Sequence, residues 1–268
     1  MRKSILSLAV AAAALVPGLA AAQATSPSPL TGNMTLVTDY RFRGISQTFG
    51  KPAFQGGFDY AHSSGFYLGN WDSNVAETAG YPGGNLEMDF YGGYKKAFGD
   101  FGLDAGLLYY YYPGTKAEGG GAFGPLFNPH SPTKTNNGTV YNTEVYVAGS
   151  WKWITLKWSH ALSDYFLTPD TKGTNYLDLG AAYDMGGGWG VNGHVGHLSV
   201  HNFSEASYTD YKLGVTKDLS GWVLGASLVS TNAKHDCSNG DPYCFFKSTG
   251  GTYDAGKSTI VLSVGKTF

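Results

Sequence analysis

Twelve short segments of alternating apolar and polar residues constrain the fold more than any other feature of this chain. Each is about the length at which a tilted strand crosses a bilayer, roughly 9–11 residues. An even number of strands is what a closed antiparallel bacterial barrel requires. The segments are 33–44, 53–62, 66–75, 86–96, 103–112, 141–151, 154–164, 176–184, 189–200, 209–218, 222–231 and 259–268. The pattern predicts an all-β fold, a 12-stranded antiparallel transmembrane β-barrel.

The connections between these segments alternate strictly in length. Short turns occupy 62–65, 97–100, 152–153, 185–188 and 219–221. Long connections occupy 45–52, 76–85, 113–138, 165–173, 201–207 and 232–257. A soluble β-sandwich, the other fold that alternating strands allow, has no reason to keep this order. The order is typical of a membrane barrel with short periplasmic turns and longer extracellular loops.

Aromatic residues agree with that orientation. Amphipathic rings favour the interface between hydrocarbon and water. The tyrosine run 109–112 meets the longest loop, at the expected outer rim. Four tryptophans fall beside short turns and are expected to form a periplasmic belt: Trp151, Trp153, Trp189 and Trp222.

The first residues have the features of a secretory signal peptide. Arg2 and Lys3 precede an apolar run, 5–15, and three alanines follow at 20–22. An N-terminal membrane anchor is the alternative, but the run is too short to span a bilayer. We therefore expect a signal peptide over 1–22, a flexible lead-in over 23–32 and the barrel over 33–268.

The last predicted strand alternates and ends on an aromatic residue, Phe268. A terminal Phe on such a strand resembles the assembly signal of bacterial outer-membrane barrels. The expected location is the bacterial outer membrane, and the expected partners are its lipid and the barrel-assembly machinery, which Phe268 would contact.

Composition argues against several other classes of function. A net charge of −2 and only 14% charged residues leave no basic patch for nucleic acid. The glycine-rich segment 119–124 formally matches a dinucleotide fingerprint, but it lacks the βα context and reads as a loop. No cofactor and no metal site is predicted, and the oligomeric state is left open.

The first predicted strand, 33–44, mixes charges with aromatic residues. Because side chains alternate along a strand, Asp39, Arg41 and Arg43 fall on one face and Tyr40 and Phe42 on the other. In a membrane barrel, the aromatic pair is expected to face lipid near the outer rim, and the charged residues a polar lumen.

Most other strand charges also take the lumenal alternation. The acids are Asp39, Asp59, Asp72, Glu87, Asp89, Asp104, Glu144, Asp178, Asp184 and Asp210, and the bases are Arg41, Arg43, Lys95, Lys157 and Lys212. A charge on the lipid face near the midplane costs a few kcal/mol, so lumenal charges are expected in any membrane barrel, and solvating the wall and fixing strand register explains them without a function. The excess of acids predicts a weak cation preference.

A charged constriction is the functional hypothesis for these residues. An acidic cluster of Asp72, Glu87 and Asp89 on adjacent strands would oppose the arginine pair. The lumen and constriction candidates are Asp39, Arg41, Arg43, Asp72, Glu87, Asp89, Glu144 and Asp178.

The only two cysteines, Cys237 and Cys244, lie in one long loop. In an exported chain they are expected to form a disulfide, since zinc needs more ligands and the compartment is oxidising. His235 and Ser238 in the same loop invite comparison with outer-membrane phospholipases, although acyl transfer needs a serine within reach of an oriented imidazole. Loop residues of this kind are usually only polar loop.

Several stretches carry a family resemblance. They are "TDYRFRGISQT", "PAFQGGFDYAHSSGFYLGNW", "YYYYPG", "YNTEVYV", "LKWSHALSDYF" and "YLDLGAAYD". Over essentially the whole mature chain, the sequence resembles the TorF-type porin family, a proteobacterial outer-membrane family of unknown function. The resemblance implies an outer-membrane barrel acting as a porin, with no agreed substrate and no catalytic residues.

The function predicted from the sequence is passive diffusion of small hydrophilic solutes. Twelve strands lie between a filled eight-stranded barrel and open porins of about 16–18 strands, so the bore should be narrow. The loop over 113–138 is expected to cap the mouth or fold into it. Two alternatives stay open, a phospholipase-like barrel enzyme and a closed structural or adhesive barrel.

Overall fold

A computed structural model describes residues 28–117, 136–247 and 249–268. The predicted signal peptide, 1–22, and most of the predicted lead-in lie outside these residues. So do the glycine-rich segment 119–124 and the central part of the long loop 113–138.

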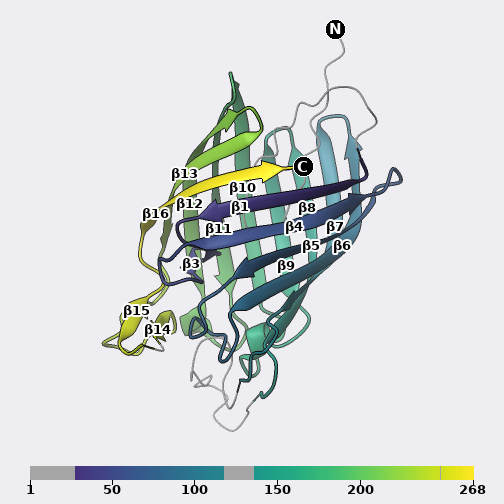
Figure 1. Ribbon diagram of the computed structural model, residues 1–268. Coiled ribbons are helices and arrows are strands. Elements are labelled where there is room, and N and C mark those ends of the chain that lie inside the picture. Colours follow the sequence, from purple (N-terminus) through teal and green to yellow (C-terminus); the bar gives the residue numbers. More distant parts are fainter. Residues whose placement is uncertain (1–27, 118–135, 248) are drawn as a thin grey trace.

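The chain folds into one closed antiparallel barrel (Figure 1), as the alternating segments predict. Consecutive wall strands pair with each other, and β1 closes the ring by pairing with both β16 and β4. The wall strands are β1 (Leu30–Val37), β4 (Ala53–Ala61), β5 (Phe66–Asn74), β6 (Leu86–Phe98), β7 (Phe101–Tyr111), β8 (Tyr141–Trp151), β9 (Ile154–Ala161), β10 (Asn175–Gly186), β11 (Trp189–Ser199), β12 (Tyr208–Leu219), β13 (Trp222–Thr231) and β16 (Thr259–Thr267).

The outward face of the wall is apolar. Phe58, Leu68, Leu213 and Ile260 each leave more than half of their surface exposed. An apolar surface that extends around a whole barrel is unstable in water and matches the hydrocarbon core of a bilayer. Within the described ranges, no helix has the length and hydropathy to span a membrane.

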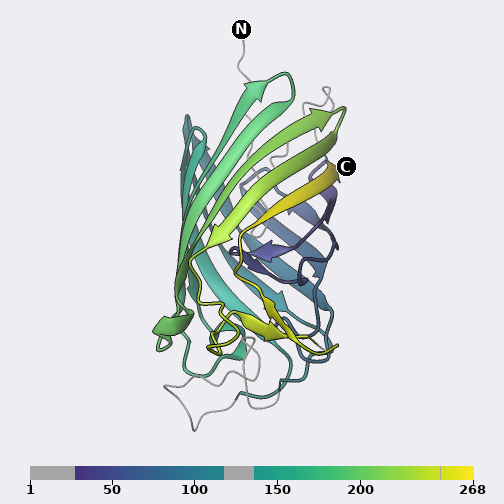
Figure 2. The ribbon, with the colours of Figure 1, turned by 90° about the vertical axis from the view of Figure 1, so that its left-hand side faces the viewer.

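The two ends of the barrel differ in their connections (Figures 1 and 2). Tight turns join β4 to β5, β6 to β7, β8 to β9, β10 to β11 and β12 to β13, and we call this the short-turn end. The longer connections gather at the opposite, long-loop end. The predicted tryptophan belt lies at the short-turn end, where lysine ammonium groups sit 4.9–5.2 Å from the ring centres of Trp151, Trp189 and Trp222.

The first strand differs from its prediction at both ends. β1 begins at Leu30, three residues before the predicted boundary, because Leu30 and the next two residues pair with β4. It ends at Val37, which lies opposite Ala53, the first residue of β4. The residues between Val37 and Ala53 therefore leave the barrel wall.

These residues form a small hairpin of their own. β2 (Arg41–Phe42) pairs with β3 (Ile45–Ser46) around a two-residue turn in which Arg43 and Gly44 both have positive φ, 47° and 80°. Positive φ at both central positions is typical of the type I′ turn that suits a tight hairpin. We call residues 39–50 the inner hairpin.

The predicted lipid-facing position of Tyr40 and Phe42 is wrong. Tyr40 is only 2% exposed, and Phe42 packs against the buried core of the barrel. The alternation continues past Val37, but wall pairing stops there, so Tyr40 and Phe42 belong to the hairpin and its contacts inside the barrel.

The buried core lies inside the barrel at the long-loop end. Its members come from the ends of wall strands, such as Tyr110 and Leu198, and from the connections there, such as Phe166 and Tyr243. The connections also contain β14 (Cys244–Phe246), β15 (Thr252–Asp254) and two 3₁₀ turns, η1 (Tyr165–Leu167) and η2 (Ser204–Ala206). Thus the described chain fills the lumen at this end.

Candidate functional site

The inner hairpin crosses the lumen and contacts opposite walls. On the β5–β7 side, the Tyr40 hydroxyl donates a 2.9 Å hydrogen bond to Glu87 Oε1, and the Tyr40 ring lies 5.5 Å from that of Trp71. The Phe42 ring lies 5.6 Å from that of Tyr110. These contacts hold the base of the hairpin against inward-facing residues of three wall strands.

Arg43, at the tip of the inner hairpin, reaches the far wall. Its Nη2 atom donates to both carboxylate oxygens of Glu144, at 2.8 and 3.1 Å, and its Nη1 atom donates to the Tyr165 hydroxyl at 2.9 Å. The guanidinium carbon lies 4.2 Å from the centre of the Tyr176 ring. A charge-assisted hydrogen bond is roughly twice as strong as one between neutral groups, and the stacked ring adds a cation–π contact.

The backbone at the tip of the inner hairpin contacts β12 and β13. The Tyr208 hydroxyl donates a 2.8 Å hydrogen bond to the Arg43 carbonyl oxygen. A Cβ atom added to Gly44 would lie 2.8 Å from Asp210 Cβ and 2.5 Å from Thr231 Cγ2. The hairpin tip therefore fits closely against β12 and β13, and only glycine fits there.

A second ion pair braces the hairpin. Arg41 Nε lies 2.5 Å from Asp39 Oδ2, and Arg41 Nη1 donates to the carbonyl oxygens of Ala255 and Lys257, each at 3.0 Å. Asp39 Oδ1 also accepts a 2.6 Å hydrogen bond from the Ser46 hydroxyl. These contacts tie the hairpin to the segment between β15 and β16.

Glu87 and Asp89 lie on β6, beside the base of the hairpin, and each is 1% exposed. Glu87 Oε2 and both Asp89 carboxylate oxygens have no hydrogen-bond partner among the described residues. A buried carboxylate without partners is costly as a charged group. The structure thus brings Asp39, Arg41, Arg43, Glu87, Asp89 and Glu144 together across the long-loop half of the lumen.

Asp72 does not join them, and its predicted lumenal position is wrong. Its neighbour Trp71 points into the lumen against Tyr40, so alternation turns Asp72 to the outer face. There it lies opposite Gly56 and Met88 and accepts a 2.8 Å hydrogen bond from Asn70. The predicted acidic cluster of Asp72, Glu87 and Asp89 therefore does not form on one face of the wall.

Asp178 faces the lumen on β10, three residues from the end of the strand at which the long loops lie. His194 Nδ1 lies 3.1 Å from Asp178 Oδ1, and His194 Nε2 lies 3.5 Å from Asp210 Oδ2. The Tyr176 hydroxyl donates a 2.9 Å hydrogen bond to the other oxygen of Asp210. His194, to which the sequence assigned no function, links two lumenal carboxylates.

Sequence reasoning also missed a layer of lumenal tyrosines. The Tyr67 hydroxyl donates to Asp104 at 2.5 Å and contacts the Tyr146 hydroxyl, and the Tyr91 hydroxyl donates to Asp59 at 2.6 Å. The glycines of the wall strands were the sequence feature that could have revealed these tyrosines. Gly69, Gly93, Gly106 and Gly196 all face inward, and a Cβ atom on any of them would collide with the side chain of a neighbouring tyrosine: Tyr91, Tyr67, Tyr146 and Tyr176.

A cavity of about 210 Å³ lies on the short-turn side of the inner hairpin. It extends from hairpin residues such as Arg43 to Trp153 in the turn between β8 and β9. We call it the vestibule. Its polar lining includes Lys157, Asp178, His194 and Lys212.

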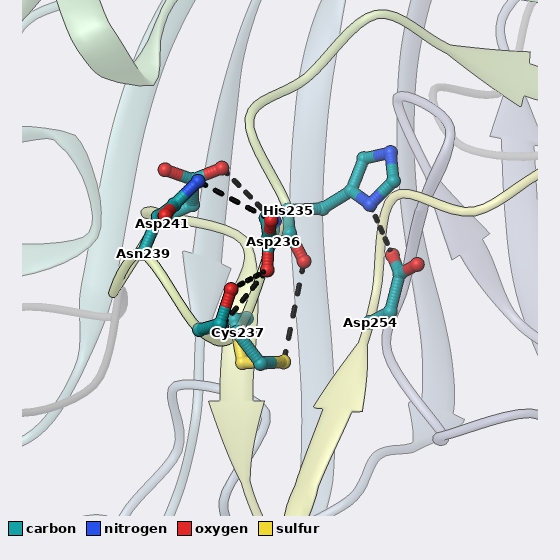
Figure 3. The surroundings of a disulfide bond; sticks show 8 residues. His235, Asp236, Cys237, Asn239, Asp241 and Asp254 are labelled. Atoms are coloured by element: carbon teal, nitrogen blue, oxygen red, sulfur yellow. Dashed lines mark hydrogen bonds and ion pairs between the residues drawn. A yellow bond between two sulfur atoms is a disulfide. The ribbon is translucent and has the colours of Figure 1, made fainter.

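The loop between β13 and β16 carries the disulfide (Figure 3). Cys237 and Cys244 are joined, with their Cα atoms 5.0 Å apart. His235 Nδ1 lies 2.8 Å from Asp254 Oδ1, whereas the Ser238 hydroxyl donates to Asp236 at 2.7 Å. The hydrogen bonds from Ser238 hold the pKa of Asp236 below its usual range.

This arrangement does not assemble a hydrolase site. The Ser238 hydroxyl is bound to a carboxylate instead of the imidazole that would activate it. In the described part of the chain, no group of three or more His, Cys, Asp or Glu side chains is placed to hold a metal ion.

The disulfide gives a direct prediction. Thiol titration of the purified, unreduced protein under denaturing conditions is expected to detect no free thiol, and reduction should release both cysteines. Detection of two free thiols before reduction would rule out the bridge between Cys237 and Cys244.

The fold is similar to solved porin structures. It matches the KdgM porin with a TM-score of 0.51 at 6% sequence identity, covering 89% of this chain and 98% of that chain. The KdgM porin in complex with disordered oligogalacturonate gives 0.49 at 6% identity, covering 89% and 97%. The NanC porin gives 0.47 at 10%, covering 89% and 98%. At such low identity, the likeness concerns the fold alone.

Sequence comparison gives the family. No curated protein sequence matches this chain. Residues 21–268, nearly the whole chain, match the family described as "Bacterial protein of unknown function (Gcw_chp)". The chain therefore belongs to the Gcw_chp family of bacterial proteins.

Proposed function

We propose that this protein is an outer-membrane porin-like channel for passive diffusion of small hydrophilic solutes, and that the inner hairpin constricts it. The observation that carries the proposal is the vestibule, a polar cavity inside a barrel whose outer face is apolar. The resemblance to the TorF-type porin family supports the same reading. The channel needs no cofactor and performs no catalysis.

The proposed setting is the bacterial outer membrane. Export would follow from the signal peptide over 1–22 and its cleavage, and assembly from recognition of Phe268 by the barrel-assembly machinery. The long-loop end would then face the outside and the short-turn end the periplasm. Lipid would contact the apolar outer face.

The constriction in this proposal is the inner hairpin together with the wall residues that it contacts. Tyr40 with Glu87 of β6 and Arg43 with Glu144 of β8 hold the hairpin on one side of the lumen, and the contacts of Arg43 and Gly44 with β12 and β13 hold it on the other. None of these contacts is covalent, and the hairpin is not paired into the barrel wall. Solutes would pass when the hairpin moves aside. Asp178 would line the path on the short-turn side of the hairpin, in the vestibule.

We also propose that the conducting channel weakly prefers cations. Even without Asp72, the inward acids outnumber the inward bases, and a low-dielectric tube strengthens the field of its lining. Movement of the hairpin would carry Arg41 and Arg43 away and leave Glu87, Asp89 and Glu144 facing the path. This preference should fade in high salt, since the screening length falls from about 10 Å at 0.1 M to 3 Å at 1 M.

A reversal potential under a KCl gradient across a planar bilayer tests the proposal. The unmodified protein is expected to conduct with a small potential of cation-selective sign. The change Arg41→Ala with Arg43→Ala should enlarge that potential, and Glu87→Gln with Asp89→Asn should reduce it. Asp72→Asn is the matched control, because this carboxylate lies on the outer face and its loss should leave the potential unchanged. Anion selectivity, or the same potential in every variant, would reject the assignment.

A further inference from the structure

We propose that the vestibule is a binding site for small carboxylate anions, with Lys157 and Lys212 as its anion-binding groups. The inference deepens the proposed function, on which it rests, by naming a class of solute. It is drawn from the lumenal wall formed by β9, β10, β11 and β12.

Charged side chains follow one another around that wall. Strand pairing places Lys157 of β9 directly opposite Asp178 of β10, and His194 of β11 directly opposite Lys212 of β12. All four line the vestibule. The wall therefore presents two lysines, separated by a carboxylate and an imidazole that already contact each other.

The other charged groups of the vestibule already have partners, so the two lysines are available to bind an anion. Arg41 is paired with Asp39, and Arg43 with Glu144. Asp178 is engaged by His194. Lys157 packs its ammonium 4.2 Å from the centre of the Tyr146 ring, and within the described ranges neither lysine has a carboxylate oxygen within 4.0 Å.

The facing wall of the vestibule adds no negative charge. β13, β16 and β1 line it with small or neutral side chains: Thr35, Val37, Gly225, Ser227, Val229, Val261, Ser263 and Gly265. An anion held by the lysines would therefore meet no carboxylate across the cavity. The serine hydroxyls can donate hydrogen bonds to it.

Charge and size together define the ligand. Of the charged residues lining the vestibule, Arg41 is paired with Asp39 and Arg43 with Glu144, which leaves Asp178 against Lys157 and Lys212, so positive charge is in excess. An ammonium group in a narrow, partly desolvated cavity gains from a carboxylate partner. A cavity of about 210 Å³ suits a molecule of a few carbon atoms and is smaller than typical sites for drug-sized ligands, which run about 300–1,000 Å³.

This site and the cation preference belong to different parts of the lumen. The lysines line the wider vestibule, which exists while the inner hairpin closes the long-loop half. The cation preference is attributed to Glu87 and Asp89, which are buried beside the hairpin and would face the path only when it moves. Ion selectivity in KCl and anion binding in the vestibule can therefore be measured separately.

Calorimetric titration of the refolded protein in detergent micelles tests the site, with malonate as the probe and malonamide as its uncharged counterpart. We expect malonate to bind and malonamide not to bind. Lys157→Met with Lys212→Met should weaken malonate binding at least tenfold. Lys95→Met is the matched control, because Lys95 also faces the lumen but packs over Tyr67 outside the vestibule, and its loss should leave the affinity unchanged.

Two results would overturn the inference. The first is that malonamide binds as tightly as malonate. The second is that the double lysine variant, shown by circular dichroism to keep its strand content, binds malonate with unchanged affinity. The experiments distinguish failure of this inference from failure of the proposed channel function. If malonate binds through the lysines but the protein does not conduct in bilayers, the site stands and the channel does not. If the protein conducts but malonate does not bind, the channel stands and the site does not.

Discussion

Arg43→Met is expected to raise the time-averaged conductance of the channel several-fold, because it removes the contact that fixes the inner hairpin to the far wall and so increases the fraction of time for which the channel is open. The ion pair between Arg43 and Glu144 is buried, with side chains 7% and 3% exposed. Truncating one member of a buried pair typically costs about 3–5 kcal/mol, since the other charge is left uncompensated. A shift of about 1.4 kcal/mol already changes the ratio of closed to open hairpin tenfold. Single-channel recording in a planar bilayer measures the change.

The partner residue supplies the internal control for this prediction. Glu144→Met added to Arg43→Met removes the orphaned carboxylate, so the double variant should close more often than the single variant. Lys95→Met should behave like the unmodified protein, because the Lys95 ammonium packs over the ring of Tyr67, a wall residue of β5. A single variant with unchanged conductance would mean that Arg43 does not hold the closed state.

Gly44→Val is expected to displace the tip of the hairpin and to increase conductance to a similar degree. Gly44 has a φ of 80° and lies so close to β12 and β13 that its added Cβ would approach Asp210 Cβ to 2.8 Å. Cβ atoms do not approach each other this closely, so the hairpin or the strand must move. Single-channel recording again provides the measurement, with the strand content checked by circular dichroism.

Gly240→Val is the matched control for Gly44→Val, because it introduces the same kind of backbone strain without a collision. Gly240 also has a positive φ, 68°, but a Cβ atom placed there would meet nothing within 4 Å. Both valines carry the same conformational penalty of about 1–2 kcal/mol, and only the one at Gly44 collides with the barrel wall. Equal conductance of the two variants would show that the fit of the hairpin tip does not control the path.

The barrel wall could be predicted from the sequence because the patterns that identify membrane strands and their connections involve only residues close together in the chain. Period-two alternation identifies a strand that is apolar on one face, and the order of short and long connections identifies the ends of a membrane barrel. Eleven of the predicted segments correspond to wall strands with small changes at their ends. The first predicted segment starts three residues late and was extended past Val37, where the wall strand ends.

The inner hairpin was missed because its two short strands alternate just as a wall strand does. Arg41 and Phe42 point to opposite sides whether the chain continues straight or turns back. The turn signal was the glycine after Arg43, since a residue pair with positive φ favours glycine in second place. That signal alone does not say whether a hairpin folds into the lumen, because this depends on Glu144, which is far away in the sequence.

Asp72 was misplaced for a related reason. Asp72 was expected to face the lumen because charges avoid the lipid face of a barrel wall. Here Trp71 has a partner inside, the Tyr40 ring of the hairpin, and its inward packing turns Asp72 outward. Lys157 and Lys212 were recognised as lumenal, but their lack of partners became visible only when His194 was found to engage Asp178.

Swelling of proteoliposomes in an uncharged pentose solution tests the central claim most directly, because it detects passage of a small hydrophilic solute without regard to charge. The account predicts that liposomes with the unmodified protein swell faster than protein-free liposomes, and that those with the Arg43→Met protein swell several-fold faster still. If neither protein accelerates swelling when both are folded and inserted, the barrel is closed to solutes and the channel assignment is contradicted.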